Sequence, residues 1–505
     1  MSSTVRLNAR DNVVVAREQL DPGQTLADAG VTVTAQVPRG HKVATEAIAE
    51  GDPVRKYDQI IGFASQPIAA GDHVHVHNCT MGEFARDYAI GSEAKPTELV
   101  PAGQRATFQG FRRANGGVGT RNFIGILSSV NCSATVSKFV AQQFPKEELA
   151  LYPNVDGIVA LTHGTGCGMA DSGEGFAALQ RVLWGYARHP NFAGVLMIGL
   201  GCEVNQIDFL LEAYQIKRGP TFRTMTLQGV GGTRKTLEKA SEIIREMLPY
   251  ANEFRREPCS AEHLSLALQC GGSDAYSGIT ANPALGACAD LLVRHGGTAI
   301  LAETPEIYGA EHLLTRRAAS PEVAEKLLQR IRWWEDYTAR NGGEMNNNPS
   351  PGNKAGGLTT ILEKSLGAAA KGGTTALTDV ILYAEPAKTK GFVFMDSPGY
   401  DPASVTGQVA SGANLVAFTT GRGSCFGFKP APSIKIATNS PMYAHMIEDM
   451  DINAGAVLDE GVSIEAMGQE MFDYVLRVAS GEPTKSEALG LGDHEFVPWQ
   501  IGAVM

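Results

Sequence analysis

The stretch that decides the fold is Gln269-Cys270-Gly271-Gly272-Ser273-Asp274-Ala275-Tyr276-Ser277-Gly278. It follows an apolar run at residues 264–268, which is typical of a buried strand, and it precedes a helical pattern at residues 284–294. In α/β proteins, a strand, a Gly-rich polar bend and a helix form a ligand site at the carboxyl end of the strand. Taken alone, the stretch is explained equally well as a tight turn in which Asp274 caps the helix.

The same design recurs along the chain, and this recurrence favours a functional site. Apolar runs that alternate with helical patterns predict α/β domains with parallel sheets. Gly116 and Gly119 precede a predicted strand instead of following one, so no dinucleotide-binding fingerprint is indicated. The predicted strands are followed by Cys132, Cys167, Cys202, Glu203, Cys270, Glu303 and Arg422.

Composition limits the class of protein. The chain has 505 residues, 43% hydrophobic and 19% charged, which is typical of a globular protein with two to four domains. A net charge of -11 argues against nucleic acid as the main partner. No apolar run has the length of a membrane helix, and the first residues lack the apolar stretch of a signal peptide, so we expect a cytoplasmic protein.

The eight cysteines are widely spaced, and no C-x-x-C motif is present. A disulfide framework is not expected in a reducing compartment. Several cysteines follow apolar runs beside Gly, Glu or His, which suits metal or redox-sensitive chemistry. For any one of them taken alone, a buried inert cysteine is the commoner case.

The N-terminal residues 1–79 read as a small β-rich module. His73, His75 and His77 alternate along one predicted strand and should therefore share a face. They are either solvated histidines on an edge strand or part of a catalytic or metal site. His41 and Lys42 follow a Gly turn and could supply an acid–base pair.

The remaining chain divides into a linker and two larger domains. Residues 80–107 form an irregular linker that is either mobile or wrapped on the surface. A middle α/β domain spans residues 108–255. A C-terminal parallel-sheet domain of Rossmann-like type spans residues 256–505.

Cationic and acidic side chains in the Gly-rich segments indicate a type of chemistry. Arg422, Lys354 and Arg121 lie where anion binding would need them, although for any one of them taken alone a solvated surface charge is the commoner case. Carboxylates such as Asp274 and Glu303, together with the histidines, suit Fe(II), Mn(II) or Mg(II). Anion clamps, a divalent metal and an acid–base pair are the groups needed to remove a proton next to a carboxylate.

Several phrases also resemble a known family, the altronate dehydratase/galactarate dehydratase sugar-acid hydro-lyases, over essentially the whole chain. The resemblance is carried by Gly40-His41-Lys42, residues 71–78, residues 116–122, residues 198–203, residues 270–274, residues 348–354 and residues 419–423. It implies an N-terminal β-clip (SAF-type) domain, a middle domain that helps to form a homodimer, and a C-terminal Rossmann-like domain with a metal site. It further implies iron-dependent dehydration of an aldonate or aldarate to a 2-keto-3-deoxy acid.

On this basis we predict three groups of site residues. The β module acts as a lid whose linker allows closure. The metal ligands are Cys270, Asp274 and Glu303. Acid–base groups come from His41, Lys42, His75 and His77, and substrate-binding groups are Arg121, Ser273, Asn353, Lys354 and Arg422.

Three alternatives stay open at this level. Cys132, Cys167, Cys202 and Cys270 could hold an iron–sulfur cluster, as in other hydro-lyases. The leaving group could be sulfite, as in a sulfolactate lyase. His75-x-His77 resembles altronate dehydratase and sulfolactate sulfo-lyase. Residues 152–157 and 450–455 instead resemble galactarate dehydratase. A sugar-acid-binding regulator is the third, but no basic recognition helix supports it.

Overall fold

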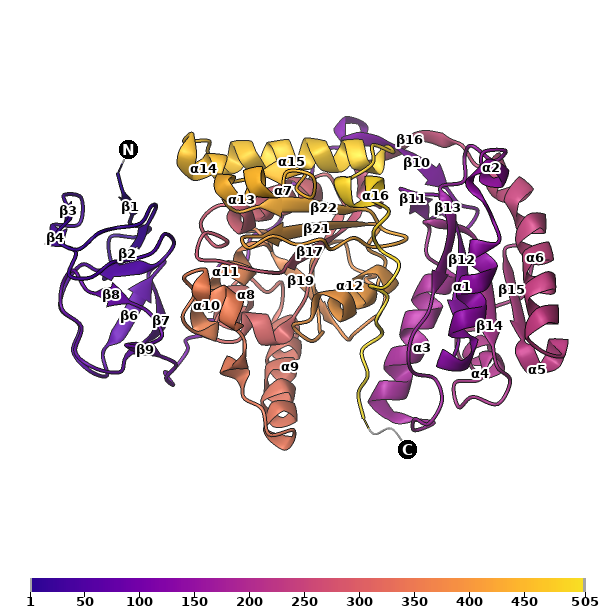
Figure 1. Cartoon of the computed structure of the whole chain (residues 1–505), viewed down its shortest axis with the longest axis horizontal. Helices are drawn as coiled ribbons and strands as arrows, with labels where there is room; N and C mark the ends of the chain where they lie inside the picture. Colours follow the sequence, from indigo (N-terminus) through magenta and orange to yellow (C-terminus); the bar gives the residue numbers. More distant parts are fainter. Residues whose placement is uncertain (1, 503–505) are drawn as a thin grey trace.

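The computed structural model describes residues 2–502 and shows three bodies in a row (Figure 1). The N-terminal β module lies at one end, the C-terminal domain lies in the middle, and the second domain lies at the other end. Spatial order therefore differs from chain order. The predicted fold class, α/β with a small N-terminal β domain, is confirmed. None of the described helices has the length and apolar character needed to cross a membrane.

The N-terminal module consists of short antiparallel strands around two small apolar cores. The predicted strand over residues 73–77 is wrong beyond Val74. The Asn78 side chain accepts a hydrogen bond from the backbone N–H of His75 and donates one to the carbonyl of His73, and this closes a turn. The strands are β1 (Thr4–Val5), β2 (Val13–Ala16), β3 (Thr25–Leu26), β4 (Val31–Thr32), β5 (Lys42–Ala44), β6 (Pro53–Lys56), β7 (Gln59–Ala64), β8 (His73–Val74) and β9 (Cys79–Thr80).

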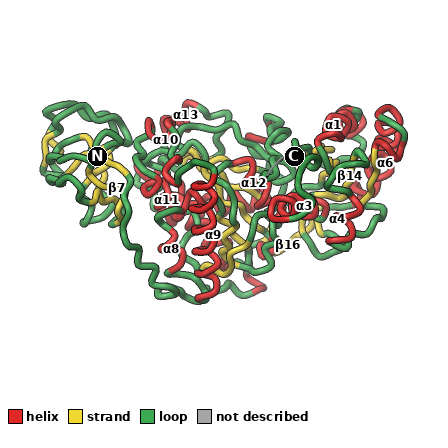
Figure 2. Tube along the Cα trace, turned by 90° about the horizontal axis from the view of Figure 1, so that it is seen from below, coloured by secondary structure: helices red, strands yellow, loops and turns green. Residues whose placement is uncertain are grey.

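The linker is wrapped on the surface of the C-terminal domain and forms a strap over residues 81–106. Figure 2 shows it as a long loop leaving the N-terminal module. Backbone N–H groups of Gly91 and Val100 donate to the carbonyls of Thr315 (3.0 Å) and Arg294 (2.8 Å). Arg86 forms an ion pair of 2.9 Å with the buried carboxylate of Glu311. These contacts fix the strap along most of its length.

The second domain is a four-stranded parallel sheet in the order β13-β12-β14-β15. Helices α1 and α6 cover one face, and α3 covers the other. Its elements are β12 (Phe123–Ser128), α1 (Ala134–Gln142), α2 (Lys146–Leu149), β13 (Gly157–Leu161), α3 (Gly173–Ala187), β14 (Phe192–Gly199), α4 (Ile207–Ala213), β15 (Phe222–Thr226), α5 (Leu227–Val230) and α6 (Thr233–Glu253).

A short antiparallel sheet and a shared core join the second domain to the third. Strands β10 (Thr107–Arg112), β11 (Val118–Gly119) and β16 (Arg256–Ser260) form the sheet β11-β10-β16 at the crossover. Helix α3 of the second domain packs on α12 of the third, and side chains such as Tyr186 and Phe418 belong to one hydrophobic cluster. The two domains therefore behave as one packed unit.

The third domain is a seven-stranded parallel sheet in the order β19-β20-β18-β17-β21-β22-β23. Helices α7 and α15 pack together on one face. The strands are β17 (Ser265–Cys270), β18 (Thr298–Leu301), β19 (Leu377–Ile381), β20 (Gly391–Met395), β21 (Leu415–Thr420), β22 (Ser433–Ala437) and β23 (Ile452–Asn453). The helices are α7 (Ala281–Arg294), α8 (Glu311–Thr315), α9 (Pro321–Arg340), α10 (Pro351–Ala355), α11 (Ile361–Ala370), α12 (Asp401–Ala410), α13 (Ser440–His445), α14 (Ala456–Asp459), α15 (Ile464–Ala479) and α16 (Lys485–Ala488).

Candidate active site

The Gly-rich stretch after β17 lies where the strand order of the large sheet reverses. From β17 the chain builds one half of the sheet through β18, β19 and β20, and then crosses to β21 on the other side of β17. Cys270 pairs with Thr419 at the carboxyl ends of these two strands. Open parallel sheets bind ligands at such a switch point, so the loops after β17 and β21 flank the candidate site.

A compact group of buried charged side chains lies at this switch point. The Cys270 thiol is 2.8 Å from the Lys371 ammonium and 3.8 Å from the Glu306 carboxylate. Lys364 donates to Glu306 at 2.8 Å. Donor atoms of Cys270, Glu303 and Glu306 all lie within 4.8 Å of one another. We call these five residues the buried acidic cluster.

Burial and neighbouring charges set the protonation of the two glutamates in opposite directions. Burial raises the pKa of Glu303 well above its usual range, and the charge of Glu306 adds to this effect. Burial also acts to raise the pKa of Glu306, but the charges of Lys364 and Lys371 outweigh it and the pKa is lowered. Two neighbouring carboxyl groups with separated pKa values are typical of acid–base sites.

Two further groups extend this pattern. Burial raises the pKa of the Cys270 thiol to about 11, although the Lys371 charge opposes the effect. Burial and the charge of Glu306 raise the pKa of Asp401 to about 7. Asp401 lies against the glycine bend, since a Cβ on Gly271 would come within 2.3 Å of its carboxylate. An acid with this pKa can give or take a proton near neutral pH.

Within the buried acidic cluster, the residues that could hold a divalent metal are Cys270, Glu303 and Glu306. Both carboxylate oxygens of Glu303 are buried without a hydrogen-bond partner among the described residues, and such atoms are costly unless something pairs with them. Glu303 also takes a left-handed backbone conformation, with φ of 72°. A thiol with two carboxylates is a donor set that accepts Fe(II).

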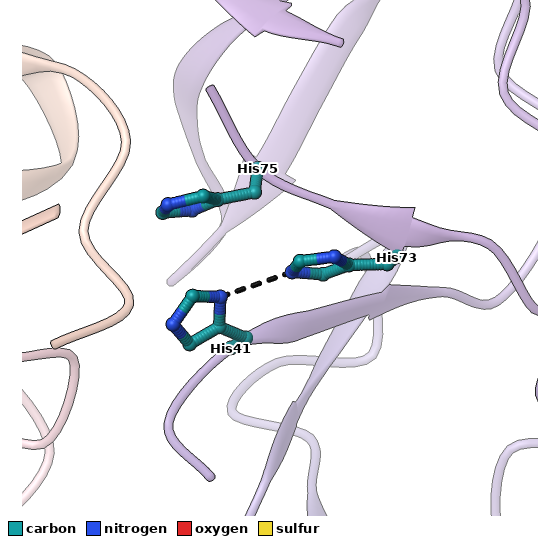
Figure 3. A group of neighbouring side chains, drawn as sticks. All are labelled: His41, His73 and His75. Atoms are coloured by element: carbon teal, nitrogen blue, oxygen red, sulfur yellow. Dashed lines mark hydrogen bonds between the residues drawn. The ribbon is translucent and has the colours of Figure 1, made fainter. Parts of the chain in front are cut away.

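A second group of potential ligands lies on the N-terminal module, where His41, His73 and His75 converge (Figure 3). His41 Nδ1 lies 3.0 Å from His73 Nε2, and the His75 ring lies 4.4 Å from the His41 ring between centroids. Nδ1 of His75 is buried without a partner among the described residues. The histidines therefore form a histidine cluster facing the C-terminal domain.

These imidazoles are neutral at physiological pH. Burial lowers the pKa of His73 to about 4 and that of His75 to about 3, and neighbouring His41 and Lys42 charges add to the shifts. The pKa of His41 is also lowered, mainly by burial. Neutral imidazoles can accept a proton or bind a metal.

One segment of the C-terminal domain connects the two clusters. Asn348 donates to Glu306 at 2.7 Å and accepts from Lys364 at 2.7 Å. Seven residues later, the carbonyl of Ala355 lies 3.3 Å from His41 Nε2. The histidine cluster and the buried acidic cluster thus border the same segment, residues 348–355.

A buried ion pair network holds the N-terminal module in place. Lys42 and Lys56 both donate to Glu363 at 2.9 Å, and Lys42 also donates to the carbonyl of Gly357 at 2.6 Å. All three charged groups are at most 1% exposed. The structure thus places Lys42, predicted as an acid–base group, in an interdomain ion pair.

The carboxylate of Asp274, a predicted metal ligand, is occupied by hydrogen bonds within the protein. The Asp274 carboxylate accepts hydrogen bonds from the backbone N–H groups of Tyr276 and Ser277 and from side chains of Ser277, Thr438 and Asn439. It shapes the glycine bend and lies outside the group of donor atoms around Cys270.

Arg121 is not brought to the site. Its guanidinium makes an ion pair with Glu487 and donates to three backbone carbonyls, which engages all five of its N–H groups. Neighbouring Thr120 bonds to the carbonyl of Asn414, which precedes β21, so Arg121 lies near the opposite end of the sheet. An arginine with no remaining donor cannot clamp a substrate carboxylate.

The other predicted substrate-binding residues gather around the glycine bend. Asn353 donates to the carbonyl of Ser273 at 2.8 Å, and the backbone N–H of Arg422 donates to Gly272 at 2.8 Å. The Ser273 hydroxyl is buried without a partner in the described part of the chain. Lys354 is half-buried and Arg422 is exposed. His77 is exposed beside the His73 ring, at 5.3 Å between centroids.

Several members of these clusters are absent from the predicted site residues: Glu306, Lys364, Lys371, Asp401, His73 and Glu363. A signal for three of them exists at α11, where Glu363 and Lys364 interrupt a run of apolar and small residues and Lys371 is the C-cap. Charges in a helix that is otherwise buried on all sides indicate a polar site.

Comparison with known proteins agrees with this architecture. Family models described as the altronate/galactarate dehydratase SAF domain, the D-galactarate dehydratase/altronate hydrolase second domain and the D-galactarate/altronate dehydratase C-terminal domain match residues 2–82, 110–252 and 261–504. The chain is 36% identical to an altronate dehydratase of Bacillus subtilis over 96% of this chain and 97% of the relative.

Two further relatives cover different shares of the chain. A galactarate dehydratase (L-threo-forming) of Escherichia coli is 36% identical over 96% of this chain and 95% of the relative. The beta subunit of a (2R)-sulfolactate sulfo-lyase from Chromohalobacter salexigens is 33% identical, over 77% of this chain and 96% of the relative. With all three family models matched in order, the chain belongs to the altronate/galactarate dehydratase family.

Proposed function

We propose that the protein is a hydro-lyase that dehydrates a sugar acid of the altronate or galactarate type to a 2-keto-3-deoxy acid. The observation that carries this proposal is the buried acidic cluster at the switch point, which combines Glu303 with a raised pKa, Glu306 with a lowered pKa and two lysines. Full-length similarity to dehydratases of two sugar acids supports the substrate class.

The metal would be held by Cys270, Glu303 and Glu306, with Fe(II) as the proposed ion and Mn(II) or Mg(II) as alternatives. When bound, it would withdraw electron density from the substrate carboxylate and so acidify the neighbouring C–H group. Lys354 and Arg422, from the two sides of the glycine bend, supply positive charge for the carboxylate.

Side chains of the protein supply the proton acceptor and the proton donor. His41 and His75 are neutral and can accept the α-proton. Asp401 can donate a proton to the leaving hydroxyl, because its pKa of about 7 leaves a protonated fraction at neutral pH. The placement of the protein in the cytoplasm and its assembly as a homodimer remain predictions.

A substrate panel tests the proposal. Purified protein with Fe(II) and a reductant is incubated with hexonates and hexarates, and formation of 2-keto-3-deoxy acid is measured. We expect turnover of one or a few stereoisomers. Sulfolactate is included because of the 33% identical sulfo-lyase subunit. Release of sulfite without dehydration of any sugar acid would replace the proposal by C–S cleavage.

The histidine cluster gives a second prediction. His75→Ala is expected to lower kcat by roughly 10²-fold or more, because a positioned proton acceptor contributes about that much. His77→Ala is the matched control, since His77 is exposed and its ring lies beside that of His73, at 5.3 Å between centroids. Steady-state kinetics of both variants measure the effect, and circular dichroism checks the fold. Equal turnover of wild type and His75→Ala would exclude the histidine cluster from proton transfer.

A further inference from the structure

We propose that the second domain carries an iron–sulfur cluster on Cys132, Cys167 and Cys202. Each cysteine follows one of three adjacent parallel strands, β12, β13 and β14, at the same carboxyl edge of the sheet. All three are exposed and form no disulfide, and Cys202 Sγ accepts a hydrogen bond from Gln228 at 3.3 Å. Three accessible thiols at one sheet edge form a soft ligand set, separate from the buried acidic cluster.

Direct hydrogen bonds hold the three cysteine-bearing loops together. The backbone N–H of Asn131, next to Cys132, donates to the carbonyl of Thr165 at 2.9 Å. The backbone N–H of Asn205 donates to the carbonyl of Gly166, next to Cys167, at 3.0 Å. The loop after β13 is therefore bonded to the loops after both β12 and β14, and the three cysteine-bearing loops lie side by side.

Glycines allow these loops to approach closely. A Cβ on Gly166 would lie 2.4 Å from the carbonyl oxygen of Ser129, and Gly166 has φ of 98°. A Cβ on Gly199 would lie 2.4 Å from the carboxylate of Glu203, which accepts from Ser129 and from the backbone of Gly201. A side chain at either glycine would collide with the neighbouring loop, so glycine is needed for the close packing at this edge.

The three thiols are not gathered as closely as one tetrahedral ion requires. Ligand sulfurs around one tetrahedral zinc lie about 3.8 Å apart, given Zn–S bonds of about 2.3 Å. Among the described residues, the groups with donor atoms within 4.8 Å of one another are the histidine cluster and Cys270 with Glu303 and Glu306, and these three cysteines are not among them. A larger cofactor with separate metal atoms can bridge wider thiols.

The cluster proposed here uses three cysteines, and Cys270 is not a fourth. Cys270 lies on the other sheet, with its buried thiol 2.8 Å from Lys371. In a cubane of four irons and four sulfides, three thiolates leave one iron without a protein ligand, so a water or a small oxyanion can bind there. Two buried polar atoms near these loops, Asn205 Oδ1 and Ser128 Oγ, have no partner in the described chain.

Anaerobic purification of the full chain, followed by iron and sulfide assays, tests this inference. We expect a brown protein with broad visible absorbance, about four irons and four acid-labile sulfides per chain in that domain, and a Mössbauer signal of a cubane cluster. Cys132→Ser, Cys167→Ser and Cys202→Ser should each remove most of the sulfide. Cys425→Ser is the matched control, because Cys425 is also exposed but follows β21 of the other sheet.

Acid-labile sulfide separates this site from the Fe(II) site of the proposed function, which contains no sulfide. Protein that contains the iron–sulfur cluster but dehydrates no sugar acid would contradict the proposed function and leave the cluster inference standing. Protein that stays colourless after reconstitution with iron and sulfide would overturn the cluster. So would a cluster that survives all three single substitutions, or stoichiometric zinc bound to the same cysteines.

Discussion

Glu303→Gln is expected to abolish sugar-acid dehydration, with a loss on the order of 10³-fold, and to leave the metal-free protein at least as stable as wild type. Glu303 is 1% exposed, and its carboxylate oxygens have no hydrogen-bond partner among the described residues. The glutamine amide has the same shape as the carboxylate but offers the metal no negatively charged oxygen. It also carries no charge that must be desolvated, so folding loses nothing.

The sign of the pH effect follows from the raised pKa of Glu303. Because the folded state holds this proton more tightly than the unfolded state, stability falls as pH rises above the unfolded pKa of about 4.5 toward the folded pKa. Glu303→Gln removes this fall, so its stability gain over wild type should grow with pH. Kinetics with Fe(II) and urea unfolding in chelator measure the two effects.

Glu306→Gln is the matched control for this prediction. Glu306 is ionised and accepts from Lys364 and Asn348, so its replacement leaves a buried ammonium without its counter-ion. We expect this variant to lose activity and stability together. If Glu303→Gln kept full activity, Glu303 would be removed from the metal site.

Glu363→Ala is expected to destabilise the protein by about 3–5 kcal/mol, because it leaves two buried ammonium groups without their carboxylate. Lys42 and Lys56 both bond to Glu363, and the Thr359 backbone and side chain donate to the same group. Burial lowers the pKa of Lys42, and the charge of Glu363 opposes this effect. The charged form of Lys42 therefore depends on its contact with Glu363. The loss should fall on the contact between the N-terminal module and the C-terminal domain.

Urea unfolding and limited proteolysis measure this effect. We expect cleavage within residues 80–107 of Glu363→Ala well before the wild type is cut. The triple variant Lys42→Met, Lys56→Met, Glu363→Met removes the charges together and should regain most of the stability, as other buried ion networks do. A change of less than about 1 kcal/mol in Glu363→Ala, within the range of exposed pairs, would contradict the assigned role.

Much of the fold follows from periodicity, but the site depends on contacts between distant segments. Apolar runs that end in polar bends correctly predicted parallel strands. The carboxyl ends of parallel strands share one edge of the sheet, so residues at these ends lie near one another. Cys270 and Glu303 follow adjacent strands and therefore meet. Lys371 follows the end of α11, 101 residues beyond Cys270, and its approach to the thiol is set by tertiary packing.

The departures have local causes. The strand expected through His77 ends at Val74 because the Asn78 side chain bonds back to His75 and His73. Asp274 is neither among the donor atoms around Cys270 nor the cap of the following helix. Its carboxylate accepts from the backbone N–H groups of Tyr276 and Ser277 and closes a local turn, whereas α7 begins at Ala281 with Thr280 as its N-cap. Arg121 follows a Gly-rich segment, as a substrate-binding arginine would. Its guanidinium instead bonds to Glu487 and to the carbonyl of Val478 in the C-terminal domain.

The placement of the N-terminal module also constrains the order of events during synthesis. Lys42 and its partner Glu363 are separated by 321 positions in the chain. The module therefore leaves the ribosome long before the surface that receives it exists, and the histidine cluster stays exposed to water in the interval. Docking on this surface is a late, long-range step whose rate depends on how closely the tether keeps the module to the growing domain. A strap that binds Thr315 and Arg294 along its path shortens that search, so the nascent enzyme gains its activity only when the last domain has folded.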